Sequence, residues 1–278
     1  MNLHSFPPIP GTLRPKQVRP AAVAGRFYTS HPEELRRTVT ALLEAVPAPT
    51  GPAPKALIVP HAGYIYSGPV AASAYARLAP DRDLIRRIVL VGPSHREAVT
   101  GIAACSWEAF ATPLGLVPLD GCALPRLAAL PQVVVRNSAH AGEHSLEVQL
   151  PFLQCVLGEG FTLVPLLVGE SSTEEVSEVL EALWGGPETR LIISSDLSHY
   201  HNPSEARQLD GATASAIEAL APEDIPEDGA CGRLPIRGLL EAAQHHGLRA
   251  TTVDLRNSGD IAGGRQQVVG YGAFVFGT

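Results

Sequence analysis

The feature that most restricts the fold of this chain is a series of short apolar runs that are mostly continuous rather than alternating. Strands buried on both faces have this pattern, because every side chain then packs against a covering layer. Longer segments with helical periodicity lie between the runs. The expected strands are 56–59, 88–91, 133–135, 162–168, 191–193, 250–255 and 268–276, and the expected helices are 68–78, 145–157, 172–184, 204–220 and 233–246.

This alternation predicts an α/β fold, a three-layer αβα sandwich with a mostly parallel central sheet. One more helix is expected ahead of the first strand. Ser30 followed by Glu33 has the spacing of a capping box, and Leu35, Val39 and Leu42 then repeat at helical spacing.

The domain organisation follows from the proline-rich segments. Residues 1–19 have many prolines and little apolar periodicity, which predicts an extended N-terminal arm. The stretch 47–54 is a stiff connector too short to separate domains. Residues 20–278 are therefore expected to form a single domain.

The composition argues against several function classes. The formal net charge of -7 gives no overall basic surface, so no nucleic-acid partner is expected. No apolar run approaches the ~20 residues of a membrane span and no signal-peptide pattern is found, so a cytoplasmic protein without a membrane partner is expected. The chain has no GxGxxG after a strand, no P-loop and no GxSxG elbow, which removes the usual support for dinucleotide, nucleotide and classical hydrolase sites.

Polar residues follow several of the expected strands. His61 comes after 56–59 and His95 after 88–91, while His140 and the pair Glu143-His144 follow 133–135. The strand 191–193 leads into Ser194-Ser195-Asp196-Leu197-Ser198-His199. Ligands of open α/β sheets bind beyond the carboxyl ends of strands, and imidazole is a good ligand for iron, copper or zinc. The shared placement therefore favours a metal site over separate local hydrogen bonds.

The four cysteines lack CxxC spacing, which indicates neither a zinc knuckle nor a disulfide framework. Cys231 stands out, because it lies directly before an expected helix and close to Arg233, and both features favour the thiolate that binds metals. The other three, Cys105, Cys122 and Cys155, are expected to be packing residues.

The chain carries the following segments in order: Arg19–Tyr28 (RPAAVAGRFY), Val59–Tyr64 (VPHAGY) with Ser67-Gly68, Gly92–His95 (GPSH), Glu143–Glu147 (EHSLE) with Leu150-Pro151-Phe152, Ser194–Tyr200 (SSDLSHY) and Ala230-Cys231-Gly232. Together they resemble the Memo family, called protein B of the AmmeMemoRadiSam system in prokaryotes. The resemblance covers the chain from about residue 19 to the C-terminus, and an ordered set of this kind is specific.

The resemblance implies a fold similar to that of class III extradiol dioxygenases, which are non-haem iron enzymes with an αβ sandwich. It places His61 and His95 at the two histidine ligands of the metal, and Cys231 where those dioxygenases supply a glutamate. It places three more polar residues in the same pocket, His144, Asp196 and His199. A thiolate in place of a carboxylate changes the metal preference and the redox balance, so dioxygenase activity is not simply inherited.

The expected cofactor is one metal ion, iron(II) or copper in preference to zinc, and the expected activity is that of a metal-dependent oxidoreductase acting on an unidentified small molecule or peptide. His144 or His199 would act as general acid or base, and Asp196 would orient a neighbouring imidazole. Two alternatives stay open. One is a metal-free hydrolase or transferase with Cys231 as nucleophile. The other is a non-catalytic module that captures a peptide or protein, with other AmmeMemoRadiSam components as expected partners.

Overall fold

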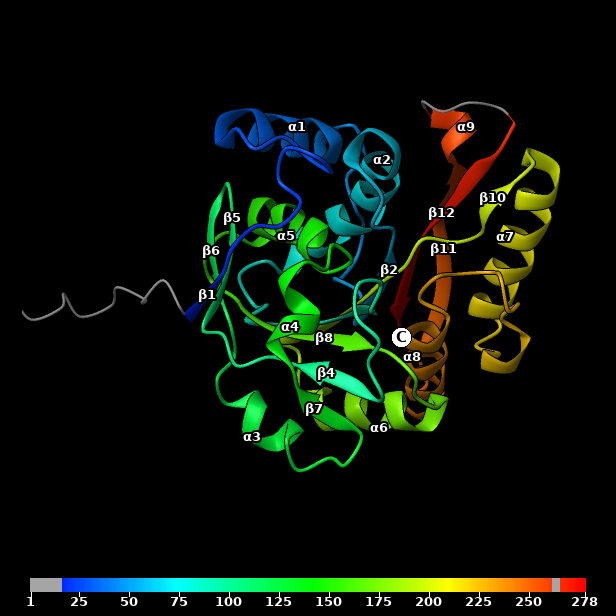
Figure 1. Ribbon diagram of the computed structural model, residues 1–278. Helices are drawn as coiled ribbons and strands as arrows, with labels where there is room; N and C mark the ends of the chain where they lie inside the picture. Colours follow the sequence, from blue (N-terminus) through cyan, green and yellow to red (C-terminus); the bar gives the residue numbers. More distant parts are fainter. Residues whose placement is uncertain (1–16, 262–265) are drawn as a thin grey trace, which may run out of the picture.

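The computed structural model describes residues 17–261 and 266–278. It shows an α/β fold in which helices cover both faces of a central sheet (Figure 1). Most of the expected N-terminal arm, residues 1–16, lies outside the described residues. The last two residues of that expected arm form strand β1 (Val18–Arg19), which pairs in parallel with β5 (Ala109–Thr112). In the part of the chain described, no helix is long and apolar enough to cross a membrane.

The centre of the main sheet is parallel. Strands β2 (Ala56–Val59), β9 (Thr189–Ser194), β3 (Arg87–Pro93) and β8 (Thr162–Val168) lie side by side in that order. Their residues are almost all buried, which explains the continuous apolar runs. The carboxyl ends of these strands therefore meet at one edge of the sheet.

The flanks of the sheet are mixed. On one side β12 (Val268–Gly277) runs antiparallel to β2 and also pairs with β11 (Arg249–Asn257) and β10 (His199–His201). On the other side β4 (Ile102–Ala104) is antiparallel to β8 and parallel to β7 (Val133–Val135). The expectation of a mostly parallel sheet thus holds for the core, whereas the flanks contain antiparallel pairs together with the parallel pair of β4 and β7.

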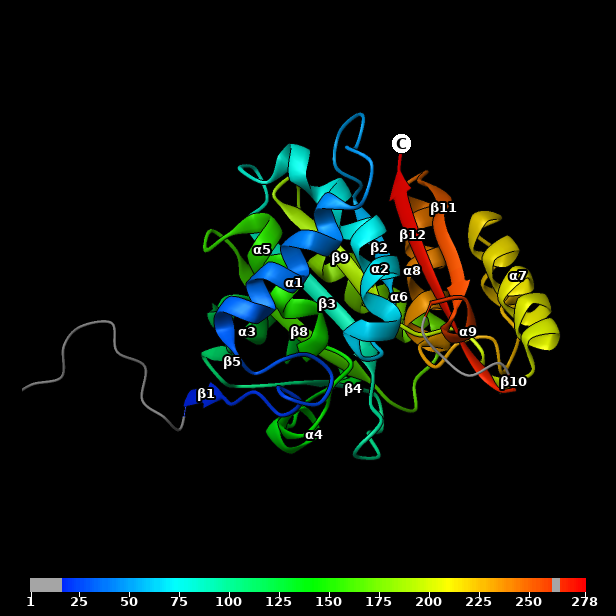
Figure 2. The same ribbon diagram turned by 90° about the horizontal axis from the view of Figure 1, so that it is seen from above.

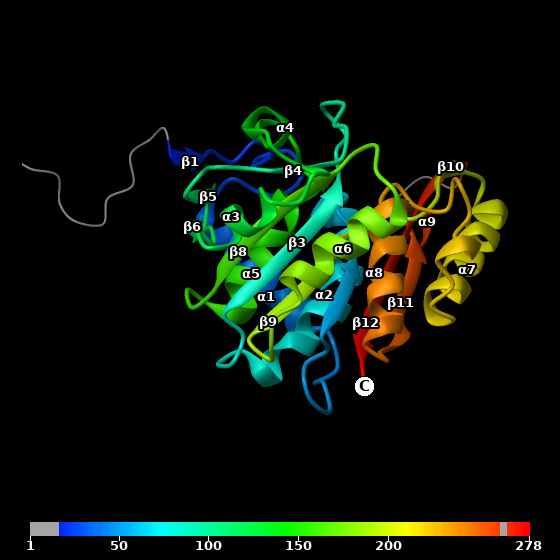
Figure 3. The same cartoon turned by 90° about the horizontal axis from the view of Figure 1, so that it is seen from below.

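Two helical layers enclose the sheet. Helices α1 (Pro32–Glu44), α2 (Tyr64–Tyr75) and α5 (Leu150–Leu157) pack on one face, seen from above in Figure 2. Helices α6 (Thr173–Leu183) and α8 (Arg233–His245) pack on the other, seen from below in Figure 3. Helix α7 (Pro203–Glu218) lies against β11 and β12.

The remaining elements are short. Strand β6 (Gly115–Pro118) extends the small sheet of β1 and β5. The short helices are α3 (Ala123–Leu127), α4 (Asn137–Ala141) and α9 (Ser258–Ile261), and the 3-10 turns are Ala76–Asp81, Glu147–Gln149 and Pro222–Asp224.

The capping box expected at Ser30 and Glu33 was wrong, although the helix itself is present. Helix α1 begins at Pro32, and His31 occupies the N-cap without a side-chain hydrogen bond. Proline at the first helical position needs no acceptor for an N–H, so this end of the helix forms without a side-chain cap. A capping box is found instead at α6, between Ser172 and Glu175.

Candidate metal centre

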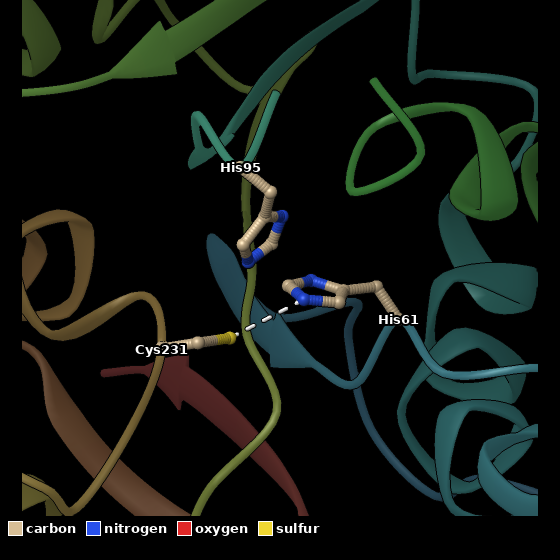
Figure 4. Close-up of side chains that lie close together, drawn as sticks. All are labelled: His61, His95 and Cys231. Carbon is tan, nitrogen blue, oxygen red and sulfur yellow. Dashed lines mark hydrogen bonds between the residues drawn. The ribbon is translucent and has the colours of Figure 1, made fainter. Parts of the chain in front are cut away.

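Three side chains that lie far apart in the sequence converge at the carboxyl edge of the parallel strands. His61 follows β2, His95 follows β3, and Cys231 precedes α8. Each offers one donor atom, and these atoms all lie within 4.8 Å of one another. Figure 4 shows the two imidazoles and the thiol pointing toward a common point. Sγ of Cys231 lies 3.3 Å from Nε2 of His61.

The tautomer of His61 follows from the partners of Ser194. The Ser194 hydroxyl donates its single hydrogen to the carbonyl of Ser145 at 2.5 Å. Its oxygen accepts from Nε2 of Gln149 at 2.8 Å and lies 2.9 Å from Nδ1 of His61. Because the hydroxyl has no second hydrogen, Nδ1 of His61 must be the donor. The lone pair of His61 therefore resides on Nε2, facing the sulfur of Cys231.

Asp196 acts on the backbone around His61. Its Oδ1 accepts from the N–H groups of His61 at 2.7 Å and Ala62 at 3.3 Å. The sequence predicted that Asp196 would orient an imidazole, but the imidazole of His61 takes Ser194 as its partner. Burial lowers the pKa of His61 to about 4, against the opposing charge of Asp196. The ring is accordingly neutral near pH 7, which is the form that binds metals.

Glu143 holds the second histidine. Its carboxylate accepts from the backbone N–H of His95 at 2.6 Å and from those of His144 and Ser145 at 2.8 and 2.9 Å, and it lies 3.1 Å from Nδ1 of His95. Burial alone would raise the pKa of Glu143, but the contacts from His144, His95 and Ser145 hold it well below its usual range. Glu143 is therefore ionised, and a hydrogen on Nδ1 of His95 leaves Nε2 free for a metal.

His144 lies in the same pocket. Its ring stacks on that of His95 with centroids 4.9 Å apart, and it stands edge-on to the ring of His61 at 5.3 Å. With His95 and Glu143 it forms a second group of donor atoms within 4.8 Å. The ring of Phe27 also contacts it, tilted by 40° with centroids 4.6 Å apart.

Two other histidines singled out in the sequence, His199 and His140, have different contacts. His199 begins β10 and makes a ring contact with Tyr200. Among the described residues, no hydrogen bond or ring contact joins His199 to the three histidines of the pocket. His140 is buried against the carbonyl of Ala103 and the ring of Phe110. His144 is thus the imidazole whose ring contacts those of both His61 and His95, and the part expected of His199 stays a prediction.

Cys231 is a protonated thiol when no cation is bound. Burial, and then the negative charge of Asp196, raise its pKa to about 12. The expectation that the helix N-terminus and Arg233 would produce a thiolate was therefore wrong for the metal-free site, because the loss of hydration outweighs both effects. A bound cation would have to supply the missing positive charge.

The backbone next to Cys231 is closely packed. The N–H of Gly232 donates to Oγ of Ser195 at 2.8 Å, and a Cβ at Gly232 would lie 2.7 Å from Cβ of Ser195. Glycine is thus needed for the close approach that holds the thiol in place. The thiol also lines a cavity of about 470 Å³, whose wall carries Glu97, Glu170, Glu227 and Arg233. Of the three residues of the centre, Cys231 alone lines this cavity.

A buried ion pair anchors the loop that carries Glu143 and His144. Nη1 of Arg19 lies 2.6 Å from Glu147, and both side chains are fully buried. Arg19 also donates to the carbonyls of His140 at 2.7 Å and Glu143 at 2.6 Å. The carboxylate of Glu147 accepts in addition from the hydroxyl of Tyr28 at 2.6 Å. The N-terminal strand therefore supports the metal centre from a distance.

The sequence singled out Glu143 beside His144 without assigning it to His95, and it gave no supporting role to Ser194 or Gln149. The position of Glu143 next to His144, after an expected strand, was a sequence feature that indicated a place in the site. The position of Ser194 at the end of a strand was a weaker indication, and no sequence feature indicated a role for Gln149.

Comparison with known proteins agrees with the motifs. Residues 19–275 match the family described as Memo-like protein. The chain belongs to the Memo family. A MEMO1 family protein of Aquifex aeolicus is 36% identical over 270 residues, which cover 94% of this chain and 99% of that protein. A MEMO1 family protein of Ignicoccus hospitalis is 37% identical over 290 residues, which cover 93% of this chain and 98% of that protein. A third, of Methanosarcina acetivorans, is 36% identical over 275 residues, which cover 93% of this chain and 99% of that protein.

The Memo match includes all the residues of the centre. It begins at Arg19, so the ion pair with Glu147 lies within the region that defines the Memo family. It also contains His61, His95 and Cys231, the group that could hold a metal ion.

Proposed function

We propose that this Memo protein binds one metal ion through His61, His95 and Cys231. The observation that carries the proposal is the convergence of two imidazoles and a thiol with their donor atoms within 4.8 Å. The orientation of His61 adds support, because its N–H is directed to Ser194 and its lone pair to the centre. Outer carboxylates and hydroxyls that hold ligating histidines in this way are a general property of metal sites.

The donor set fits a redox metal. Imidazole suits copper, iron and zinc, and thiolate favours softer ions such as copper(I). The resemblance to non-haem iron enzymes adds iron(II), so we propose iron(II) or copper before zinc. Such an ion would supply Lewis-acid and redox chemistry to a substrate, and the protein would act as an oxidoreductase.

The residues of the chain would then prepare the site for reaction. His144 lies against His95 and would hold or accept a proton from a substrate in the pocket. Phe27 contacts the His144 ring and would limit access of water there. The cavity beside Cys231 would admit the substrate.

One observation favours a second function, a metal-free cysteine hydrolase. The 3.3 Å contact between Cys231 and His61 has the geometry of a nucleophile and its base. The electrostatics oppose this reading, because burial raises the pKa of Cys231 to about 12 and lowers that of His61 to about 4. A proton transfer from sulfur to imidazole is thus unfavourable, whereas a bound cation stabilises the thiolate.

Metal analysis tests the proposal. Protein purified without a tag and without added metal should contain up to one iron or copper per chain, and anaerobic titration should restore the same stoichiometry after chelation. The His61→Ala variant should lose the bound metal, whereas the His31→Ala variant, which changes an exposed histidine, should retain it. If the protein binds neither iron(II) nor copper(I) nor zinc saturably, the metal site is excluded. An activity that survives chelators would favour the hydrolase.

A further inference from the structure

A second cavity of about 470 Å³ lies at the end of the sheet opposite to the metal centre. Strands β2 and β9 begin there, with Lys55 directly before β2 and Arg190 near the start of β9. His61 and Ser194 lie at the other ends of the same two strands. Figure 2 shows the C-terminal end of β12 beside the segment that leads into β2, at the end of the sheet away from α4. The cavity is therefore separate from the proposed metal site.

The lining of this cavity is strongly cationic. It includes Lys55, Arg77, Arg190 and Arg249. Among the described residues that line it, there is no Asp or Glu side chain. This is notable in a chain whose formal net charge is -7. Burial, and then the charge of Arg190, lower the pKa of Lys55 to about 8, as expected for a cation held among other cations.

Two of the four cations are already engaged by the protein. Nζ of Lys55 donates to the carbonyls of Trp184 at 2.6 Å and of Gly186 and Thr189 at 3.1 Å. Nη2 of Arg190 donates to Asp81 at 2.8 Å. Lys55 supplies positive potential, whereas the charge of Arg190 is offset by Asp81, and both residues hold the walls in place.

The other two cations have no protein partner. In the described part of the chain, the guanidinium groups of Arg77 and Arg249 make no hydrogen bond and no ion pair, and Nε of Arg77 is buried without an acceptor. Nε of Arg190, a side chain that is only 4% exposed, is also without an acceptor. Buried donors without acceptors are destabilising, since their lost hydration is not replaced. An anion would provide the missing charge and acceptors.

We propose that this cavity binds a small organic phosphate, with the phosphate group held by Arg77 and Arg249. The two arginines come from different elements, the 3-10 turn after α2 and the start of β11, and line the same cavity, and guanidinium groups bind phosphate through charge-assisted hydrogen bonds. Threonine and glycine residues line part of the wall, and apolar residues that suit an organic group line another part: Pro49, Pro52, Ala53, Pro54, Leu248 and Val275. The volume falls within the range of small-molecule sites, about 300–1,000 Å³.

The test uses phenyl phosphate as the probe. Nζ of Lys55 lies 5.2 Å from the ring centre of Trp184, so occupation of the cavity should change the fluorescence of this tryptophan. The only other tryptophan, Trp107, can be removed by Trp107→Phe. Titration in this background, repeated by calorimetry, should show saturable binding that weakens as salt is added.

Matched variants locate the binding. Arg77→Gln and Arg249→Gln should each weaken phenyl phosphate binding by at least ~10-fold, the effect of losing one charge-assisted contact. Arg37→Gln, which removes an exposed charge on α1, should leave it unchanged. Metal content should stay at the wild-type level in all three variants, which separates this proposal from that of the metal site.

Three results would overturn the proposal. The first is equal affinity of the wild type and both cavity variants for phenyl phosphate. The second is the absence of saturable binding at millimolar concentrations in calorimetry. The third is equal binding of phenol or benzoate, which would mean that the cavity does not select a phosphate group.

Discussion

The sulfur of Cys231 lies 3.3 Å from Nε2 of His61, although 170 positions of sequence separate the two residues. This contact joins the end of β2 to the start of α8, and His95 completes the group from the end of β3. Either a proton or a cation can occupy the space between sulfur and nitrogen.

Replacing Cys231 with serine should weaken retention of copper(I) or iron(II) by at least ~10- to 100-fold, the scale found even for losses outside the ligand set. The reason is the loss of the single thiol donor from a three-residue group. Anaerobic equilibrium titration measures the change. Cys155→Ser and Cys122→Ser are the controls, because these cysteines lie on α5 and on the surface. Equal affinities in all four proteins would leave Cys231 as a packing residue.

Ser194→Ala should weaken metal binding without removing any ligand. The substitution deletes the acceptor of the His61 N–H and leaves the Gln149 amide with one partner fewer. We expect a metal affinity lower by ~10-fold or more and a stability loss of about 1–3 kcal/mol. Ser215→Ala on α7 is the control, since its hydroxyl bonds only within its own helix. Unchanged metal affinity in Ser194→Ala would show that the ring orientation does not depend on this hydroxyl.

Metal affinity should rise with pH between about pH 6 and 8. The metal must displace a proton from Cys231, whose pKa is about 12, so each unit of pH below that value should lower the apparent affinity about tenfold. His61 adds nothing in this window, because its pKa of about 4 leaves it neutral throughout. Titrations at several pH values measure the slope. A flat profile in the wild type would mean that sulfur is not a ligand.

Arg19→Met should destabilise the fold by about 3–5 kcal/mol, since it leaves the buried carboxylate of Glu147 without its cation. Denaturant unfolding measures this free energy. Arg82→Met, which breaks an exposed pair with Asp83, should change it by less than ~1 kcal/mol. The double change Arg19→Met, Glu147→Leu should recover part of the loss; a double variant less stable than Arg19→Met would contradict this account.

The strands could be predicted from the sequence because a strand that is buried on both faces has a continuous run of apolar residues. The run 162–168 coincides with β8, and 133–135 with β7. Strands of three or four residues with mixed composition, such as β5 and β6, carry too little pattern to be recognised. The false capping box at Ser30 had the right spacing, but Pro32 sets where the helix begins.

The ligand group could be proposed from the motifs, whereas its supports depend on pairing between distant strands. Ser194 aligns with Val59 in the register of β9 and β2, which places its hydroxyl near the ring of His61. Glu143 reaches His95 across 48 positions. The protonated state of the Cys231 thiol was also not predicted. The local sequence shows that a helix begins there, but it does not show that the sulfur loses its hydration on burial.

The anchoring of Arg19 against Glu147 has a consequence for synthesis of the chain. The loop that carries Glu143 and His144 is held by the first described strand, and Cys231 is synthesised only after His61, His95 and His144. A nascent chain that stops before α8 lacks the sulfur, and a product clipped at its amino end lacks the anchor. For the proposed metal site, metal content would then be a measure of completed folding, and early loading at the two histidines alone would be disfavoured.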